Sequence, residues 1–221
     1  MVEDLNNIQV QADSFECSVT TDISVFAFID GKLKILLTQR TIGNFIDSWM
    51  LPGGVMESNE NLDNSAEKVL FAYTGFKNIH FEQVKAYSAI DRHPLKRVLT
   101  VSFYALIKPE NHPIIQGENV SNIKWFGVKK LPKNLGFDHE KIISDSHIYL
   151  KNNLRDRLVV GELLPEKFTM NELQILYESI LEEKLDKRNF RKRIFQMEIL
   201  KNTGEIKPGI KGGPTLFTLQ K

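Results

Sequence analysis

The sequence predicts an α/β fold: an α/β/α sandwich around a mixed sheet, followed by a small C-terminal winged helix-turn-helix domain. In the first two thirds of the chain, apolar runs of strand length alternate with turn residues. Two stretches there, 62–73 and 138–154, have the three- and four-residue spacing of amphipathic helices. Residues 169–219 then have the pattern of two short helices and a glycine-rich hairpin. We therefore expect two domains, residues 1–155 and residues 156–221.

The composition is that of a globular protein. Of the 221 residues, 42% are hydrophobic and 26% are charged, which excludes disorder over most of the chain. The single cysteine, Cys17, allows no internal disulfide, and the first residues are acidic and polar, unlike a signal peptide. No apolar run approaches the ~20 residues that a membrane span needs. We expect a cytoplasmic protein without membrane association.

Charge is distributed unevenly along the chain. Residues 184–221 carry ten Lys or Arg against three acids, whereas the remainder carries nineteen against twenty-five, although the whole chain has a net charge of only +1. A basic end on an acidic body is typical of a module that binds a polyanion. The alternative, a solvated basic tail, stays open at this point.

The strands of the first domain can be placed from the sequence. Residues 19–28 and 33–38 predict two strands joined at Asp30-Gly31, which is a hairpin signal. A polar loop at 41–48 follows the second strand. Further strands are predicted at 81–89, 98–107 and 123–128, with a polar loop at 90–97. The helix at 138–154 is expected to close the domain against its sheet.

The second domain begins after a junction that we place between residues 154 and 168. Thr169 and Glu172 have the spacing of a capping box that opens a helix ending at Leu181. A second helix is expected at 186–197, with Phe190 and Ile194 facing inward and its basic residues facing outward. The glycine-rich basic stretch at 204–214, flanked by strands at 199–200 and 215–219, has the form of a wing.

The loop before the first helix carries a motif. Gly54, Glu60 and the Gly75-Phe76 pair are spaced as in the Nudix box, which this stretch resembles. In working members of that family, three glutamates on one helix face gather a divalent metal that bridges a diphosphate. Here those positions hold Val69, Ala72 and Tyr73, and Lys68 replaces the arginine. The resemblance implies a Nudix-like α/β/α sandwich that is not an enzyme and binds no metal or other cofactor.

Three glutamates remain near the motif: Glu57, Glu60 and Glu67. They lie in the loop and the early helix, where the family uses the residue at Glu60 to cap and orient the helix. A metal centre built from them alone is not expected.

The two halves together are similar to the Nudix-related transcriptional regulators, the NrtR and AraR-like group. The matching segments are residues 49–54, 73–76, 87–97, 164–174 and 185–194. The resemblance implies that an inactive Nudix domain senses a small molecule and that the winged helix binds operator DNA. We expect a repressor that acts as a homodimer, since operators are usually near-palindromic.

The effector is predicted to lie in the former active-site cleft. The expected effector-binding residues are Arg40, Trp49, Gly53, Gly54, Glu57, Asp91, Arg92 and Arg97. Ordinary surface ion pairing is an equal alternative for the charged ones. The resemblance allows a pentose such as arabinose or an ADP-ribose-like nucleotide. Without metal-binding acids a diphosphate would rely on Arg40, Arg92 and Arg97, which favours a sugar slightly.

The DNA contacts are predicted on the basic helix and the wing. Lysines and arginines are expected to meet phosphates, and Asn189 or an arginine to reach base edges in the major groove. The expected DNA-binding residues are Thr169, Lys187, Arg188, Asn189, Arg191, Lys192, Lys207 and Lys211.

Two other functions remain possible from the sequence. The first is a Nudix hydrolase of nucleoside diphosphate derivatives such as ADP-ribose, with the C-terminal module as an accessory. The second is a ligand-binding scaffold that does not bind DNA.

Overall fold

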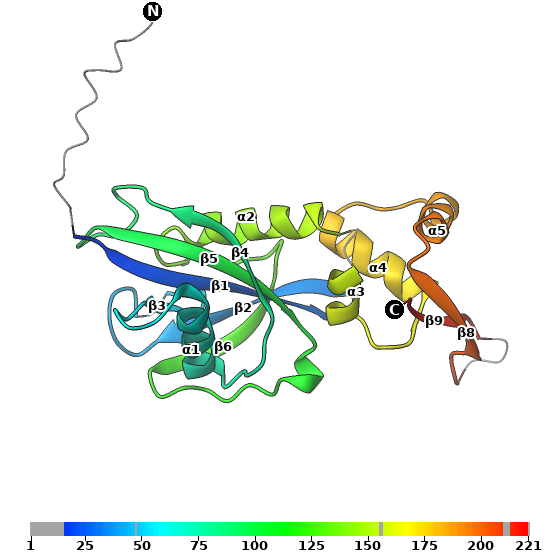
Figure 1. Cartoon of the computed structure of the whole chain (residues 1–221), viewed down its shortest axis with the longest axis horizontal. Coiled ribbons are helices and arrows are strands. Elements are labelled where there is room, and N and C mark those ends of the chain that lie inside the picture. The colour runs from blue at the N-terminus through cyan, green and yellow to red at the C-terminus, as the bar shows by residue number, and fades with distance from the viewer. Residues whose placement is uncertain (1–15, 47, 155–156, 210–212, 221) are drawn as a thin grey trace, which may run out of the picture.

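The protein has an N-terminal α/β domain and a C-terminal winged helix, which follow one another along the long axis of the molecule (Figure 1). The structure is a computed structural model, and it describes residues 16–46, 48–154, 157–209 and 213–220. The predicted domain boundary between residues 155 and 156 falls outside the described residues and stays a prediction. No helix in the described part is both long enough and apolar enough to cross a membrane.

The N-terminal domain is built on a mixed sheet, as predicted. Its strands are β1 (Ser18–Ile29), β2 (Lys32–Arg40), β3 (Gly53–Val55), β4 (Phe81–Tyr87), β5 (Val98–Ile107) and β6 (Val120–Gly127). They run in the order β4-β5-β1-β2-β6, and β3 pairs with β1. Only β1 and β5 are parallel among these pairs. Asp30 and Gly31 take left-handed backbone angles in the tight turn between β1 and β2, which confirms the hairpin.

Two helices cover opposite faces of this sheet, which gives the predicted sandwich. Helix α1 (Leu62–Thr74) buries Ala66, Val69 and Leu70 against one face, together with Ile23 of β1. Helix α2 (His139–Asn152) packs against the other face, where Phe26 belongs to the core. Because side chains alternate across a strand, neighbouring residues of β1 serve both cores.

The ends of α1 follow from its sequence. The side chain of Asn61 accepts a hydrogen bond from the backbone N–H of Asn64 at 2.8 Å, which satisfies one of the free amides at the helix start. Gly75 ends the helix in the left-handed conformation, with φ of 74°, and its N–H donates to the carbonyl of Phe71 at 2.8 Å. The helix therefore ends where the sequence predicted.

The C-terminal domain contains the expected helix pair and wing. Its elements are α3 (Arg157–Leu163), β7 (Phe168–Thr169), α4 (Met170–Leu181), α5 (Lys187–Gln196), β8 (Leu200–Ile206) and β9 (Thr215–Leu219). The capping box at Thr169 and Glu172 is present in both directions. A short 3-10 turn, η2 (Pro109–Asn111), and the short strands β3 and β7 were not predicted, because two- or three-residue strands exist only through their partners.

One hydrophobic core continues through both domains. The cluster that contains Phe26 and Ile142 also contains Leu176, Phe190 and Phe217 of the winged helix. Polar contacts reinforce this junction. The backbone N–H of Leu33 donates to Ser179 Oγ at 2.6 Å, and the hydroxyl of Tyr177 donates to the carbonyl of Leu154 at 2.9 Å. The winged helix is therefore packed onto the sheet and α2 along an extensive contact.

The close approach of Gly75, at the end of α1, to Ile115 can be tested by substitution. In a Gly75→Ala variant the added Cβ would lie 2.7 Å from Cβ of Ile115, in a left-handed conformation that disfavours side chains. The left-handed backbone costs ~1–2 kcal/mol for a residue with a Cβ, and crowding adds about 1–3 kcal/mol. We expect denaturant unfolding to show a loss of about 2 kcal/mol or more.

Gly43→Ala is the matched control, because Gly43 has φ of 86° but no heavy atom within 4 Å of the added Cβ. It should show only the backbone cost. Equal losses in the two variants would contradict the predicted contact with Ile115.

Candidate functional site

A cavity of about 130 Å³ lies between the start of β1, the glycine turn at β3 and the start of α2. Its lining includes four of the predicted effector residues: Arg40, Gly53, Gly54 and Arg92. The backbone needs glycine at position 53, because a Cβ there would collide with the carboxylate of Asp22. The glycine turn thus brings the backbone close to buried charge.

The floor of this cavity is a buried ion-pair network. The guanidinium of Arg92 binds Asp138 through two hydrogen bonds of 2.7 and 3.1 Å, and it also donates to Thr100. Asp22 lies 3.9 Å from the same guanidinium. Only 5% of the Arg92 side chain is exposed. Its donors are engaged by the protein, so Arg92 organises the cavity floor more than it offers free hydrogen bonds.

His139, the first residue of α2, closes this floor. Its Nδ1 accepts a hydrogen bond from the backbone N–H of Leu51 at 2.9 Å, while Nε2 faces Asp22 at 3.7 Å. Burial lowers the pKa of His139, and the nearby Asp22 only partly opposes this effect. The imidazole is therefore held neutral, with Nδ1 as its acceptor.

Arg40 stands at the wall of the cavity, at the end of β2. Its Nη2 donates to the carbonyl of Gly53 at 2.6 Å, and its guanidinium lies over the ring of Tyr73, 5.4 Å from the centroid. The Nε of Arg40 is buried and has no hydrogen-bond partner among the described atoms. Burial raises the pKa of Tyr73, so that ring stays neutral beside the cation.

A second cavity, of about 470 Å³, begins on another side of Arg40. Ala72 and Tyr73 line it, and these are two of the three positions where the Nudix motif has metal-binding acids. The third, Val69, is buried and packs beside Gly54, where an added Cβ would lie 2.9 Å from Val69 Cγ2. The three positions that hold metal-binding acids in the Nudix motif thus carry apolar or aromatic side chains here.

The remaining glutamates of the motif serve the loop. Glu60 accepts a hydrogen bond from the backbone N–H of Glu57 at 2.8 Å, and this bond is the main cause of its lowered pKa. Lys68 pairs with both carboxylates. Within the described residues, no group of three or more His, Cys, Asp or Glu is arranged to hold a metal ion.

The other predicted effector residues lie outside the lining of both cavities. Trp49 packs edge-on against Phe126, with ring centroids 4.7 Å apart. Glu57 is exposed and paired with Lys68, and Asp91 is exposed. Arg97 donates to the carbonyl of Ser88 at 2.8 Å. These placements favour packing or surface roles for all four.

Sequence reasoning missed several lining residues. His93 and Lys96 line the smaller cavity with Phe137 and His139. The His93 ring stacks on Phe137, with centroids 5.3 Å apart. His93 and Lys96 belong to the polar loop at 90–97, where other effector residues were predicted, so that loop pointed to them. Residues 137–139 reach the cavity only through the fold.

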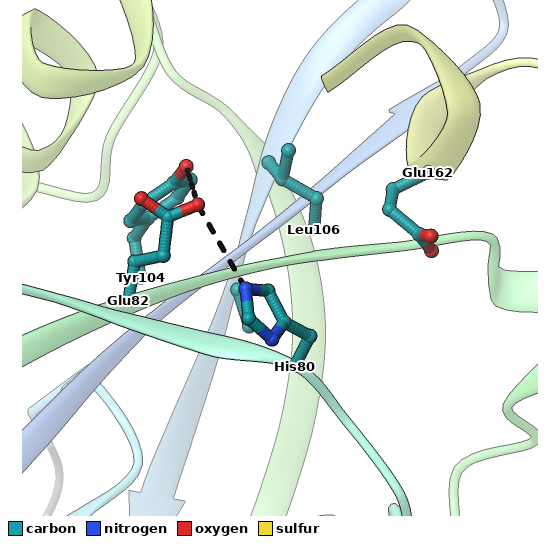
Figure 2. A pocket seen from close by; sticks show the side chains of 6 residues that line it. His80, Glu82, Tyr104, Leu106 and Glu162 are labelled. Atoms are coloured by element: carbon teal, nitrogen blue, oxygen red, sulfur yellow. Dashed lines mark hydrogen bonds and ion pairs between the residues drawn. The ribbon is translucent and has the colours of Figure 1, made fainter. Parts of the chain in front are cut away.

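A separate cavity lies between β4, β5 and α3 (Figure 2). Its volume is about 10 Å³, enough for about one water molecule. Glu82 there accepts a hydrogen bond of 2.9 Å from the hydroxyl of Tyr104, and His80 approaches the same carboxylate at 3.9 Å. This polar cluster is too small to hold an effector.

Helix α5 lies at the end of the molecule far from α1 (Figure 1). Phe190 and Ile194 are buried, and the Asp186 side chain caps the helix through the N–H of Asn189 at 2.9 Å. The remaining face is exposed and carries Lys187, Arg188, Asn189, Arg191, Lys192 and Arg193. Among the described residues, none of its five cations forms an ion pair with an acid.

Three other predicted DNA contacts have different placements. Thr169 is only 3% exposed, and its hydroxyl bonds to Glu172, which favours a capping role over the predicted DNA contact. Lys207 of the wing pairs with Glu172 at 2.6 Å, so it ties the wing to α4. Lys211 lies outside the described residues.

Both parts of the chain match known families. Residues 20–145 match the NUDIX domain, and residues 160–219 match the NrtR DNA-binding winged helix domain. The chain is 31% identical over 192 residues to the "ADPR responsive transcriptional repressor NtrR" of Acinetobacter baylyi, across 86% of this chain and 76% of that protein. The chain belongs to the NrtR family of Nudix-related transcriptional regulators.

Solved structures of an NrtR protein from Shewanella oneidensis are similar to this chain. The NrtR of that organism complexed with a 27mer DNA is 29% identical, with a TM-score of 0.76, and covers 91% of this chain and 93% of its own. Its NUDIX domain complexed with ADP ribose is also 29% identical, with a TM-score of 0.54, over 66% of this chain and 96% of that one. As an NrtR-family member, the chain is a DNA-binding transcriptional regulator.

A Nudix enzyme is also similar to the N-terminal part of this NrtR-family chain. The ADP-ribose pyrophosphatase of Methanocaldococcus jannaschii is 30% identical over 123 residues, which cover 56% of this chain and 71% of that protein. The N-terminal domain is therefore related both to effector domains and to hydrolases.

The neutral state of His139 predicts a pH dependence of stability. The unfolded chain binds a proton at this residue more readily than the folded chain, since burial lowers the folded pKa. The free energy of unfolding should therefore fall as the pH drops below the ordinary histidine pKa of about 6.5. His93 and His147 also have lowered pKa values and contribute in the same direction.

Urea unfolding between pH 7.5 and about 5 measures this slope, above the range where carboxylates titrate. His139→Asn keeps an acceptor for Leu51 N–H and should flatten the slope. His80→Asn, which changes an exposed histidine, is the matched control. An unchanged slope in His139→Asn would contradict the assignment.

Proposed function

We propose that this chain is a repressor that binds operator DNA through α5, binds ADP-ribose in its Nudix domain without hydrolysing it, and releases DNA when the nucleotide is bound. The observation that carries the proposal is that one continuous hydrophobic core joins the Nudix domain to the winged helix. The first has a cavity without metal-binding acids, and the second has an exposed helix with five cations that have no acidic partner in the described residues.

The choice of ADP-ribose over a pentose rests on two kinds of support. Relatives of this chain are named for ADP-ribose as a regulatory ligand or as a substrate. In addition, the smaller cavity is lined by the cations Arg40 and Lys96, which suit an anion better than a neutral sugar. The slight preference for a sugar from the sequence therefore gives way to the nucleotide.

The absence of hydrolysis follows from the residues at the acid positions. Nudix chemistry needs a metal that bridges the diphosphate and activates water. Val69, Ala72 and Tyr73 cannot provide oxygen ligands of that kind, and Glu57 and Glu60 are engaged by Lys68. The chain keeps a cavity and lacks the means of cleavage.

Helix α2 supplies a physical route from the cavity to the DNA-binding domain. At its start, Asp138 and His139 belong to the cavity floor. Near its end, His147 Nε2 lies 2.8 Å from the carbonyl of Ile180 on α4, and Lys151 pairs at 2.9 Å with Glu182, the residue that caps the end of α4. We propose that effector binding favours one placement of α2 and, in a homodimer, changes the spacing of the two α5 helices.

The DNA-binding part is tested by an electrophoretic mobility shift assay with the DNA upstream of the protein's own gene. Removing two cations from α5 in Arg188→Ala with Arg191→Ala should weaken binding at least about tenfold and reduce its salt dependence. Lys77→Ala with Lys133→Ala removes the same charge from exposed positions of the N-terminal domain and should leave binding unchanged. Equal losses in both pairs would show that only net charge matters, and would argue against α5 as the DNA interface.

The effector part is tested by adding ADP-ribose to the protein–DNA complex with Mg²⁺ present. We expect release of DNA at a nucleotide concentration that also raises the melting temperature of the free protein. Chromatography should recover the ADP-ribose intact. Arabinose is the comparison ligand. Release by arabinose alone would reject the nucleotide, and Mg²⁺-dependent cleavage that is lost in Glu57→Gln with Glu60→Gln would support the hydrolase alternative.

A further inference from the structure

Arg40 is the one described residue that lines both cavities at the glycine turn and the end of α1. The smaller one, of about 130 Å³, has the polar floor formed by Asp22, Arg92 and His139. The larger one, of about 470 Å³, lies beside Ala72 and Tyr73. A ligand that occupies both cavities would therefore contact this guanidinium.

The guanidinium also lies beside one of the positions where the Nudix motif has a metal-binding acid. It covers the ring of Tyr73, which holds one of the acid positions, and it binds the carbonyl of Gly53, which belongs to the glycine turn of the motif. A cation of the chain itself thus contacts one former acid position and the glycine turn of the motif.

The hydrogen bonding of Arg40 is incomplete. No ion pair joins Arg40 to an acid within the described residues, and its buried Nε has no hydrogen-bond partner. A buried donor without a partner costs ~1–3 kcal/mol, and few such groups occur in folded proteins. A small shift of the side chain toward a ligand would give this donor an acceptor.

We propose that Arg40 replaces the metal and binds the diphosphate of the effector, with the adenosine in the larger cavity and the distal ribose in the smaller one. This inference rests on the proposed function. A guanidinium is planar and always charged, and it can donate to two phosphate oxygens at once. The larger cavity offers Ile42 and Tyr73 as apolar surface for the base, and Glu118 as an acceptor for its amino group. The smaller cavity offers polar groups for ribose hydroxyls.

Isothermal titration calorimetry on the full chain tests the role of Arg40, with ADP-ribose and adenosine as ligands, in EDTA and in Mg²⁺. The wild-type affinity for ADP-ribose should be the same in both buffers. Arg40→Gln should weaken ADP-ribose binding by roughly tenfold to 150-fold, since it removes hydrogen bonds to a charged group. Adenosine, which has no phosphate, should lose less than about twofold, which is within ordinary variation.

Two variants control for charge and folding. Lys133→Gln removes an exposed cation that lies outside both cavity linings and should keep the wild-type affinity. Arg40→Lys keeps the charge without the planar fork and should give an intermediate loss. Thermal unfolding of each variant establishes that it is folded, and Arg40→Lys carries the test should Arg40→Gln fail to fold.

The placement of the two ends is tested by filling the larger cavity. Ala72 is exposed on α1, so Ala72→Phe can be accommodated while it occupies that space. It should weaken both ADP-ribose and adenosine and leave ribose 5-phosphate unaffected. Weaker ribose 5-phosphate binding with unchanged adenosine binding would overturn the assignment of the ends.

The outcomes separate this inference from the proposed function. If the wild-type chain does not bind ADP-ribose in either buffer, the proposed function fails. If it binds ADP-ribose but Arg40→Gln binds equally well, or if binding requires Mg²⁺, the replacement of the metal by Arg40 is overturned and the regulator proposal stands.

Discussion

The ion pair between buried Arg92 and partly buried Asp138 is the interaction on which the smaller cavity depends. An arginine that is almost fully removed from water needs partners for its charge and its donors, and here Asp138, Asp22 and Thr100 provide them. These partners come from β1, β5 and the start of α2, whereas Arg92 comes from the loop after β4. Without Asp138, the buried guanidinium would keep only Asp22, 3.9 Å away, as an acidic partner among the described residues. The network therefore fixes four segments at one place.

The same network determines how the cavity relates to the DNA-binding surface. Asp138 and His139 hold the first turn of α2, and the last turns of α2 contact the end of α4. Packed cores resist gradual deformation, so a shift at one end of a helix is accommodated by moving the helix as a body. On the proposed route, the shared core around Leu176 and Phe190 would carry that movement into the winged helix. His147 couples the two sides within this core, where a neutral imidazole meets a backbone carbonyl.

The sequence predicted the parts that depend on local rules. Periodicity and capping chemistry placed α1 with its glycine end, the capping box of α4 and the basic face of α5, because these depend on residues close in the chain. The site was predicted less completely, since its residues meet only through the fold. Nothing in the sequence near Phe137 and His139 indicates that they line a cavity. Trp49 packs against Phe126 and does not line the predicted effector cavity. Lys207 and Thr169 could not be assigned without knowing that both bind Glu172.

The replaced acids explain how a hydrolase scaffold can become a sensor. A divalent metal in such a site both neutralises the diphosphate and lowers the pKa of a bound water to make a nucleophile. A guanidinium performs the first task alone, since it donates hydrogen bonds but coordinates no water. On the proposal for Arg40, the exchange retains most of the binding electrostatics and removes the step that would consume the ligand. The packing of Val69 beside Gly54 makes the change difficult to reverse at that position, because a glutamate there would place a carboxylate in space now filled by apolar atoms.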